Sequence, residues 1–194
     1  MANQITAADI MDMDAYAKIR KDKRKALVQV KKDRRVALGP HATFYFENYD
    51  TMWLQIHEML FIEKGGAAQV PDELEAYNPL IPNGRELVAT LMFEIDNPVL
   101  RKEVLSKLGG VEETCFLKFA GHEVVGTAEE DVDRTTADGK ASSVQFIHFS
   151  LSDAQVAAFK AEGTEVTLGI KHPAYANMTI LQDATRSALS KDFD

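Results

Sequence analysis

Apolar residues near the N-terminus recur at helical spacing. Four of them fall near one stripe of a helix that we predict over residues 12–34, namely Tyr16, Ile19, Leu27 and Val30. The stripe is narrow, and Lys and Arg occupy the other faces of the helix. We therefore expect this helix to pack along one thin seam and to present its cations to solvent.

The segment TMWLQIHEMLFIEK has a broader apolar face, which is typical of a core helix. Asp50 or Thr51 is the expected N-cap, and Gly65-Gly66 is the expected end. Later helices are expected over PDELEAY, VLRKEVLSKL, DAQVAAFKAEG after the cap Ser152, and Ala184 to Asp192.

Strand patterns occur between these helices. They cover ATFYFE, the nearly continuous apolar run ELVATLMFEI, two strands around Ala120-Gly121, SSVQFIHFSL and TEVTLGIKH. AEEDVDRTTADGK is predicted as a polar loop. Because the strands lack regular helical crossovers, we expect an α+β fold, in which helices pack on one side of a mainly antiparallel sheet and a long basic helix precedes it.

Length and composition favour one globular domain. The chain has 194 residues, of which 45% are hydrophobic, so it can form a core without disulfides or metal. Cys115 is the only cysteine, which excludes an intrachain disulfide and a cysteine-built metal cluster. The N-terminus lacks a signal-peptide pattern, and no apolar run is long enough to span a membrane. We therefore expect a cytoplasmic protein.

Charge is distributed unevenly between the basic helical arm, residues 1–35, and the acidic α+β body, residues 36–194. The first 35 residues hold ten Lys/Arg and five Asp/Glu, a net charge of +5, and the remainder holds twelve against twenty-five, a net charge of −13. Asp22 and Asp33 interrupt the basic helix, and aromatic residues are sparse there, so a protein surface is favoured over nucleic acid as its complement. That surface is expected within the chain or on a dimer partner.

Two polar segments are the candidate sites. In FENYDTMWLQIHEML, Thr51, Gln55 and Glu58 share a helical face, with Glu47 and Asn48 just before it. Glu47 and Glu58 form a carboxylate pair suited to a metal or to acid–base chemistry, if that face lines a pocket. The alternative is a solvated polar stripe with Asn48 in a turn.

In YNPLIPNGRE, prolines stiffen a loop that carries Tyr77, Asn78, Arg85 and Glu86. Arg85 could bind a carboxylate or phosphate, although such a loop also serves simply to connect elements. Glu86 and Glu94 flank a buried strand. They either simply mark the ends of that strand or contribute to a binding site. No nucleotide-binding glycine loop is present, and the pattern indicates no cofactor.

The histidines and the cysteine add no motif. The spacing of His41, His57, His122, His148 and His172 matches no metal-binding pattern, so we interpret them as structural or surface residues and predict no metal. Cys115 is either inward and inert or outward beside Lys118, and the inert interpretation is favoured.

The segments RRVALGPHATFYFEN, TMWLQIHEML and YNPLIPNGRELVATLMFEI together resemble the bacterial domain of unknown function family numbered 3501, and the resemblance extends through SSVQFIHFSL and GIKHPAY. It implies a single-domain cytoplasmic protein. It also implies a role in redox chemistry or peroxide defence, because members are encoded near a rubrerythrin-like diiron protein and an iron–sulfur oxidoreductase. It assigns no catalytic residues.

Two functions follow. The first is an accessory protein that docks a redox partner, either the rubrerythrin-like protein or the iron–sulfur oxidoreductase, through the basic helix and a polar face of the acidic body. The second is a small metal-dependent enzyme or ligand-binding protein with a site around Glu47, Glu58 and Arg85. A homodimer is compatible with both.

Overall fold

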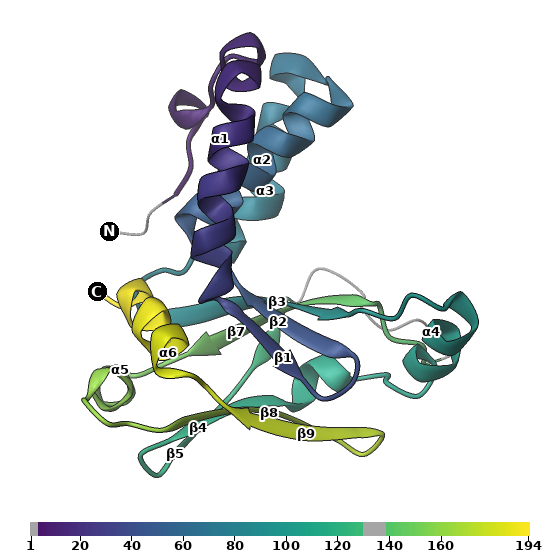
Figure 1. Ribbon diagram of the computed structural model, residues 1–194, viewed down its shortest axis with the longest axis vertical. Coiled ribbons are helices and arrows are strands. Elements are labelled where there is room, and N and C mark those ends of the chain that lie inside the picture. Colours follow the sequence, from purple (N-terminus) through teal and green to yellow (C-terminus); the bar gives the residue numbers. More distant parts are fainter. Residues whose placement is uncertain (1–3, 130–138) are drawn as a thin grey trace.

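The computed structural model describes residues 4–129 and 139–194, and its most prominent feature is a helical arm that projects from two β-sheets (Figure 1). Helix α1, Met13–Lys32, forms the length of the arm. The Asp12 carboxylate caps it by accepting the backbone N–H groups of Asp14 and Ala15, both at 3.1 Å. The helix predicted over residues 12–34 is thus present, one or two residues shorter at each end.

Helix α2, Tyr49–Glu63, packs against α1, and α3, Val70–Tyr77, packs against α2. The N-cap of α2 is Asn48, whose side chain and that of Thr51 each accept the other residue's backbone N–H. The prediction of Asp50 or Thr51 as the cap was therefore wrong, because the helix begins earlier. It ends at Lys64 in the left-handed conformation, at φ 58°.

The arm has its own small core. Its buried members come from the N-terminal segment, α2, the connection after α3 and the central strand β3, Glu86–Phe93: Ile5, Met52, Ile56, Leu60, Leu80, Ile81 and Val88. The arm is therefore more than the basic helix, because α1 is held by chain segments up to residue 88.

The first sheet has the strand order β1-β2-β3-β7-β6 and is antiparallel throughout. Its remaining strands are β1 Arg35–Leu38, β2 Ala42–Phe46, β7 Val144–Ser150 and β6 Thr127–Ala128. Strand β3 lies at the centre and is buried almost throughout, as its continuous apolar run predicts.

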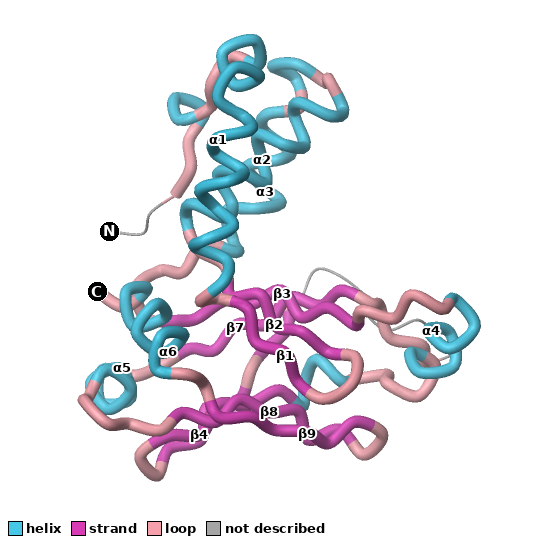
Figure 2. Tube along the Cα trace, in the orientation of Figure 1, coloured by secondary structure: helices cyan, strands magenta, loops and turns pink. Residues whose placement is uncertain are grey.

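The second sheet has the order β5-β4-β8-β9 and is also antiparallel. Its strands are β5 His122–Val125, β4 Cys115–Phe119, β8 Val166–His172 and β9 Tyr175–Ile180. Ala120 and Gly121, at φ 46° and 79°, form the two-residue turn between β4 and β5 that the sequence predicts. The two sheets face one another below the arm (Figure 2).

The main core fills the space between the sheets. Alternate residues of each strand enter it, such as Leu87, Ala89 and Leu91 of β3 and Ile147 and Phe149 of β7, all fully buried. The helices α5, Asp153–Lys160, and α6, Asp183–Leu189, close one end of the sandwich, and α4, Pro98–Leu105, lies at the other end (Figure 1).

The α+β, mainly antiparallel single-domain fold is confirmed. One difference is that the strands form two sheets, so the main core lies between sheets and not between one sheet and its helices. Strands β1 and β9 were not predicted. The predicted polar loop AEEDVDRTTADGK lies largely outside the described residues. Among the described helices, none combines the length and apolar character needed to cross a membrane.

Candidate functional site

Helix α1 has two opposite faces, and its inner face forms the seam with α2. The residues of that seam follow a spacing of three and four along the helix: Tyr16, Arg20, Lys23, Leu27 and Val30. Tyr16 is fully buried and Leu27 is 7% exposed. Because so few residues are buried, the seam is as thin as the narrow apolar stripe predicts.

Glu58 of α2 makes the polar contacts of this seam. It accepts a hydrogen bond from the Tyr16 hydroxyl at 2.6 Å and two from the Arg20 guanidinium, both at 2.8 Å. The hydrogen bond from Arg20 is the main reason that the pKa of Glu58 is lowered, and burial beside this carboxylate raises the pKa of Tyr16. Glu58 therefore joins α1 to α2.

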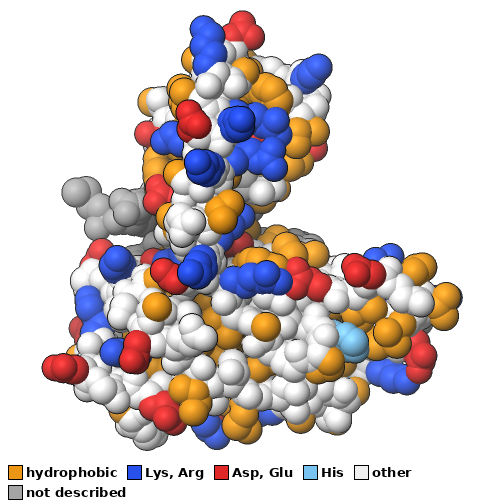
Figure 3. Space-filling model, in the orientation of Figure 1, with side chains coloured by type: hydrophobic (Ala, Val, Ile, Leu, Met, Phe, Trp, Pro, Cys, Tyr) orange, Lys and Arg blue, Asp and Glu red, His pale blue; other side chains and the backbone are white. Residues whose placement is uncertain are grey.

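The outer face of α1 carries a row of lysines. We term this row the lysine stripe; it consists of Lys18, Lys21, Lys25 and Lys32. These lysines are separated by three, four and seven residues, and they lie about 180° around the helix from the seam. All four are exposed, and none forms an ion pair with another residue of the described chain. Figure 3 shows Lys and Arg side chains along the arm from its tip to its base.

The expectation of an acidic surface within the chain as the complement of the basic arm is met on the seam and at the base of the arm, where Arg34 pairs with Asp192 and Arg35 lies 3.3 Å from Glu94, but not on the lysine stripe. Arg20 and Arg24 lie 2.8 Å and 4.0 Å from Glu58. The lysine stripe is left to contact solvent or a partner. Its signal in the sequence was the recurrence of lysine at intervals of three, four and seven residues, which places these side chains on one face of a helix.

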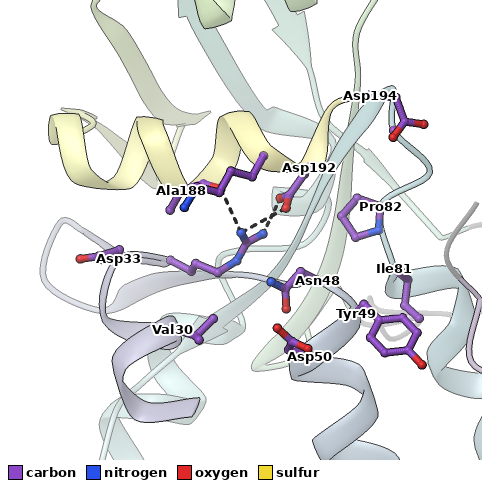
Figure 4. Close-up of a pocket in the computed structure, with 13 residues that line it drawn as sticks. Val30, Asp33, Asn48, Tyr49, Asp50, Ile81, Pro82, Ala188, Asp192 and Asp194 are labelled. Carbon is purple, nitrogen blue, oxygen red and sulfur yellow. Dashed lines mark hydrogen bonds and ion pairs between the residues drawn. The ribbon is translucent and has the colours of Figure 1, made fainter. Parts of the chain in front are cut away.

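A cleft of about 410 Å³ lies where the arm joins the sheets (Figure 4). Residues from the end of α1, the start of α2, the loop before β3 and the C-terminus line it, and Asn48 and Asp50 lie close together in it. Acidic residues outnumber cationic ones in this lining.

Arg34, beside this cleft, is 3% exposed, and hydrogen bonds occupy all of its donors. Its Nε donates to the Phe46 carbonyl at 2.9 Å, one terminal nitrogen to the Glu47 carbonyl at 2.8 Å, and the other to the Ala188 carbonyl at 3.3 Å. Both terminal nitrogens also donate to the Asp192 carboxylate. Burial raises the pKa of Asp192, and the Arg34 hydrogen bonds oppose that rise. With no donor left over, Arg34 holds the fold together and offers nothing to a ligand.

The six candidate residues from the sequence lie in different environments. Glu47 is 7% exposed and accepts a hydrogen bond from the Thr90 hydroxyl at 2.7 Å. Asn48 caps α2 and lines the cleft. Glu58 lies ten residues further along α2, about 15 Å from Asn48 at 1.5 Å per residue, and contacts α1. Glu47 and Glu58 are therefore not a pair.

The other three candidates are also separate. Gln55 donates to the Tyr77 hydroxyl at 3.3 Å, and Asn78 binds both backbone groups of Ile5, at 2.8 and 2.9 Å. Arg85 is exposed and pairs with Asp153 at 2.8 Å. The structure thus brings Gln55 and Asn78 to the arm and leaves Arg85 at the surface of the sandwich, and ligand binding by any of the six stays a prediction.

The carboxylates that flank β3 differ from each other. Glu94 accepts hydrogen bonds from the Tyr45 and Thr43 hydroxyls at 2.6 and 2.7 Å, and these lower its pKa. Glu86 lies 3.2 Å from Nδ1 of His148. No group of three or more His, Cys, Asp or Glu within residues 4–129 and 139–194 is placed to hold a metal.

Cys115 faces the core and is fully buried. Its thiol lies 3.7 Å from the Val111 carbonyl, and burial raises its pKa. The thiol is thus kept protonated, which agrees with the inert interpretation.

Comparison with known proteins gives a family and a fold. The protein family of unknown function DUF3501 matches residues 4–193. A crystal structure of a novel protein of unknown function from Burkholderia pseudomallei K96243 is 35% identical, with a TM-score of 0.91 over 99% of this chain and 100% of that chain. No curated protein matches. Because the family match covers nearly the whole chain, including the arm, both sheets and the C-terminal helix, this protein belongs to the DUF3501 family.

Proposed function

We propose that this protein is a docking protein that binds an acidic surface of a partner protein through the lysine stripe of α1. The observation that carries the proposal is the placement of Lys18, Lys21, Lys25 and Lys32 on the solvent side of a projecting helix, without an ion pair to any described residue. The chain as a whole has a net charge of −8, so these cations stand apart from the charge of the body.

The geometry of the arm suits docking. From Lys18 to Lys32 the helix rises by about 21 Å. Lys18, Lys21 and Lys25 follow one another at rises of about 4.5 and 6 Å, within a Debye length of about 8 Å at physiological ionic strength, so their potentials add, and Lys32 extends the row by about 10.5 Å. Such a row steers an acidic partner and sets its orientation more than it adds affinity. The seam with α2 keeps the row straight.

A protein partner is favoured over nucleic acid because the body repels a polyanion. Residues 36–194 have a net charge of −13, and α1 itself carries Asp14 and Asp22 among its cations. The proposed partners are the redox proteins that the family resemblance implies, the rubrerythrin-like diiron protein and the iron–sulfur oxidoreductase.

The test is a charge reversal with a matched control. The double variant Lys21→Glu/Lys25→Glu changes two exposed positions of the stripe. Lys102→Glu/Lys107→Glu makes the same change of charge at one position on α4 and one position two residues after its end. In calorimetry with each redox partner at low salt, we expect the stripe variant to lose about tenfold or more in affinity and the α4 variant to stay within about twofold of the wild type. The wild-type affinity is expected to fall as salt rises.

Three results would contradict the proposal. They are equal weakening by both double variants, no weakening by the stripe variant, and no complex with either redox protein even at low salt. Tighter binding to nucleic acid than to either protein would assign the stripe to a different class of partner.

A further inference from the structure

The edges of the two sheets differ in how they are protected against further pairing. Strand β6 has two residues, β1 has four and includes Arg35, and β5 has four and includes Glu123. Short length and charge are the means by which natural proteins block sheet edges. Strand β9, YANMTI, has six residues and contains neither a charged residue nor a proline.

Strand β9 also exposes apolar side chains. Met178 is 72% exposed and Ile180 is 57% exposed, and both lie with Ala176 on the outer face of the four-stranded sheet. Within the described part of the chain, β9 pairs with β8 along one edge, and no other strand or bridge pairs with its second edge. An edge that is long, apolar and uncharged is suited to accept another strand.

We propose that β9 pairs with β9 of a second copy of this chain, antiparallel about a two-fold axis beside Met178. The four-stranded sheets of the two copies would then form one continuous sheet. Such an interface is isologous, because each copy contributes the same strand.

Edge pairing is favoured over stacking of the two outer sheet faces. A charged cluster occupies the middle of that face, where Glu123 lies 2.7 Å from Lys171 and 3.0 Å from Lys118. Both ammonium groups also lie over the Phe116 ring, at 5.6 and 5.4 Å from its centroid. Stacking would bury these charges at a large desolvation cost, whereas edge pairing leaves them in water.

The pattern of β9 favours a second copy as the added strand. About an axis at Met178, the small Ala176 lies opposite the large Ile180 of the second copy, and no like charges meet. Lys171, the neighbour of Ala176 on β8, lies on the side of β9 away from the second copy and stays paired with Glu123 at 2.7 Å. The pairing therefore buries no charged side chain of β9 or β8.

Pairing through β9 leaves the arm outside the dimer interface. Strand β9 lies at the opposite end of the molecule from the arm (Figure 1), so the dimer would present two lysine stripes. A pair of six-residue strands buries less than the roughly 1,000 Å² of a stable interface. We therefore expect a reversible dimer.

Sedimentation equilibrium of the full chain tests the proposal. The weight-average mass of the wild type is expected to rise from monomer toward dimer between about 1 μM and 1 mM. Met178→Lys and Met178→Glu are each expected to remain monomeric, because like charges meet at the two-fold axis. Val99→Lys, at a 76% exposed position on α4, is the control and is expected to associate as the wild type does.

Mixing the two Met178 variants tests the register. Opposite charges then meet at the axis, and an equimolar mixture is expected to regain the dimer that each variant lacks. A wild type that stays monomeric up to about 1 mM, a dimer that survives Met178→Lys, or a mixture that stays monomeric would overturn the proposal. So would a monomer whose β9 amides become protected only on addition of another protein, because the added strand would then belong to that protein.

Discussion

His57 is fully buried on α2, and its two ring nitrogens have opposite hydrogen-bonding roles. Nδ1 donates to the Trp53 carbonyl at 2.7 Å, and Nε2 accepts the backbone N–H of Met11 at 3.0 Å. Protonation of Nε2 would place its N–H group against the Met11 N–H, so two donors would face each other. Burial, reinforced by nearby Lys23, lowers the pKa of His57, so the folded protein holds the neutral ring.

This arrangement predicts a loss of stability in mild acid. As the pH falls below about 6.5, the unfolded chain binds a proton at His57 that the folded chain does not, so the free energy of unfolding decreases by up to about 1.4 kcal/mol per pH unit until the pKa of the folded state is reached. Above pH 6.5 this contribution is constant. His57→Gln keeps a donor and an acceptor but cannot titrate, so its stability is expected to change less between pH 5 and 6.5. Urea unfolding followed by fluorescence of the single tryptophan, Trp53, measures both slopes.

The prediction has an independent check in the ring itself. The NMR signals of His57 are expected to show the Nδ1–H tautomer and no midpoint near 6.5. A His57 ring that titrates at its ordinary value, or equal slopes for the wild type and the Gln variant, would contradict this account.

Single residues were the least predictable part of the site. The sequence places His57 on a helix, but the partner of Nε2 is 46 positions away. Arg34 was one of ten cations before residue 36, and the contacts that distinguish it come from β2 and from the C-terminus. Such roles depend on contacts between distant segments, which periodicity does not report.

Among the elements, the N-terminal segment before α1 is held to the arm by a side-chain clip. Asn78, after α3, accepts the Ile5 N–H at 2.8 Å and donates to the Ile5 carbonyl at 2.9 Å, as a neighbouring strand would. Ile5 itself is 2% exposed in the arm core. Further along the segment, the Trp53 indole donates to the Asp9 carbonyl at 3.1 Å and His57 accepts the Met11 N–H. The Asn78 clip and the Ile5 side chain therefore hold the start of the segment.

Asn78→Ala is expected to release the start of this segment, around Ile5. Loss of two hydrogen bonds, each worth about 1 kcal/mol, should lower the free energy of unfolding by about 1–2 kcal/mol and speed hydrogen exchange at the Ile5 amide. Asn83→Ala is the matched control, because the Asn83 side chain makes only a local contact, to the Arg85 N–H at 2.9 Å. If exchange at Ile5 were as slow in Asn78→Ala as in Asn83→Ala, the clip would not hold the segment.

The elements themselves were mostly predictable from the chain. Helix periodicity and the apolar run of β3 identified their elements because burial on one face, or on both, leaves a regular pattern. Strands β1 and β9 escaped because each lies at a sheet edge and its chemistry does not follow its burial. In β9 the exposed positions hold Ala176, Met178 and Ile180, whereas the partly buried positions hold Asn177 and Thr179.

At the scale of the whole molecule, Arg34 joins the arm to the end of β2 and to the C-terminal segment. It follows α1, contacts the carbonyls of Phe46 and Glu47 between β2 and α2, and binds Ala188 and Asp192 near the C-terminus. The side chains of Arg34 and Asp192, which form an ion pair, are both buried, at 4% and 7% exposed. Removal of one partner would leave an uncompensated buried charge, which costs about 3–5 kcal/mol.

We therefore expect Arg34→Met to uncouple the arm from the sandwich. The arm, reported by Trp53 fluorescence, should unfold at lower urea than the body, reported by hydrogen exchange in β8, whereas the two transitions should coincide in the wild type. Asp192→Asn in the Arg34→Met background removes the orphaned charge and is expected to recover part of the lost stability, but not all of it, because three backbone carbonyls remain without their donor. A double variant less stable than Arg34→Met, or coincident transitions in all three proteins, would show that the arm and the sandwich are held together by the core around β3 and not by this arginine.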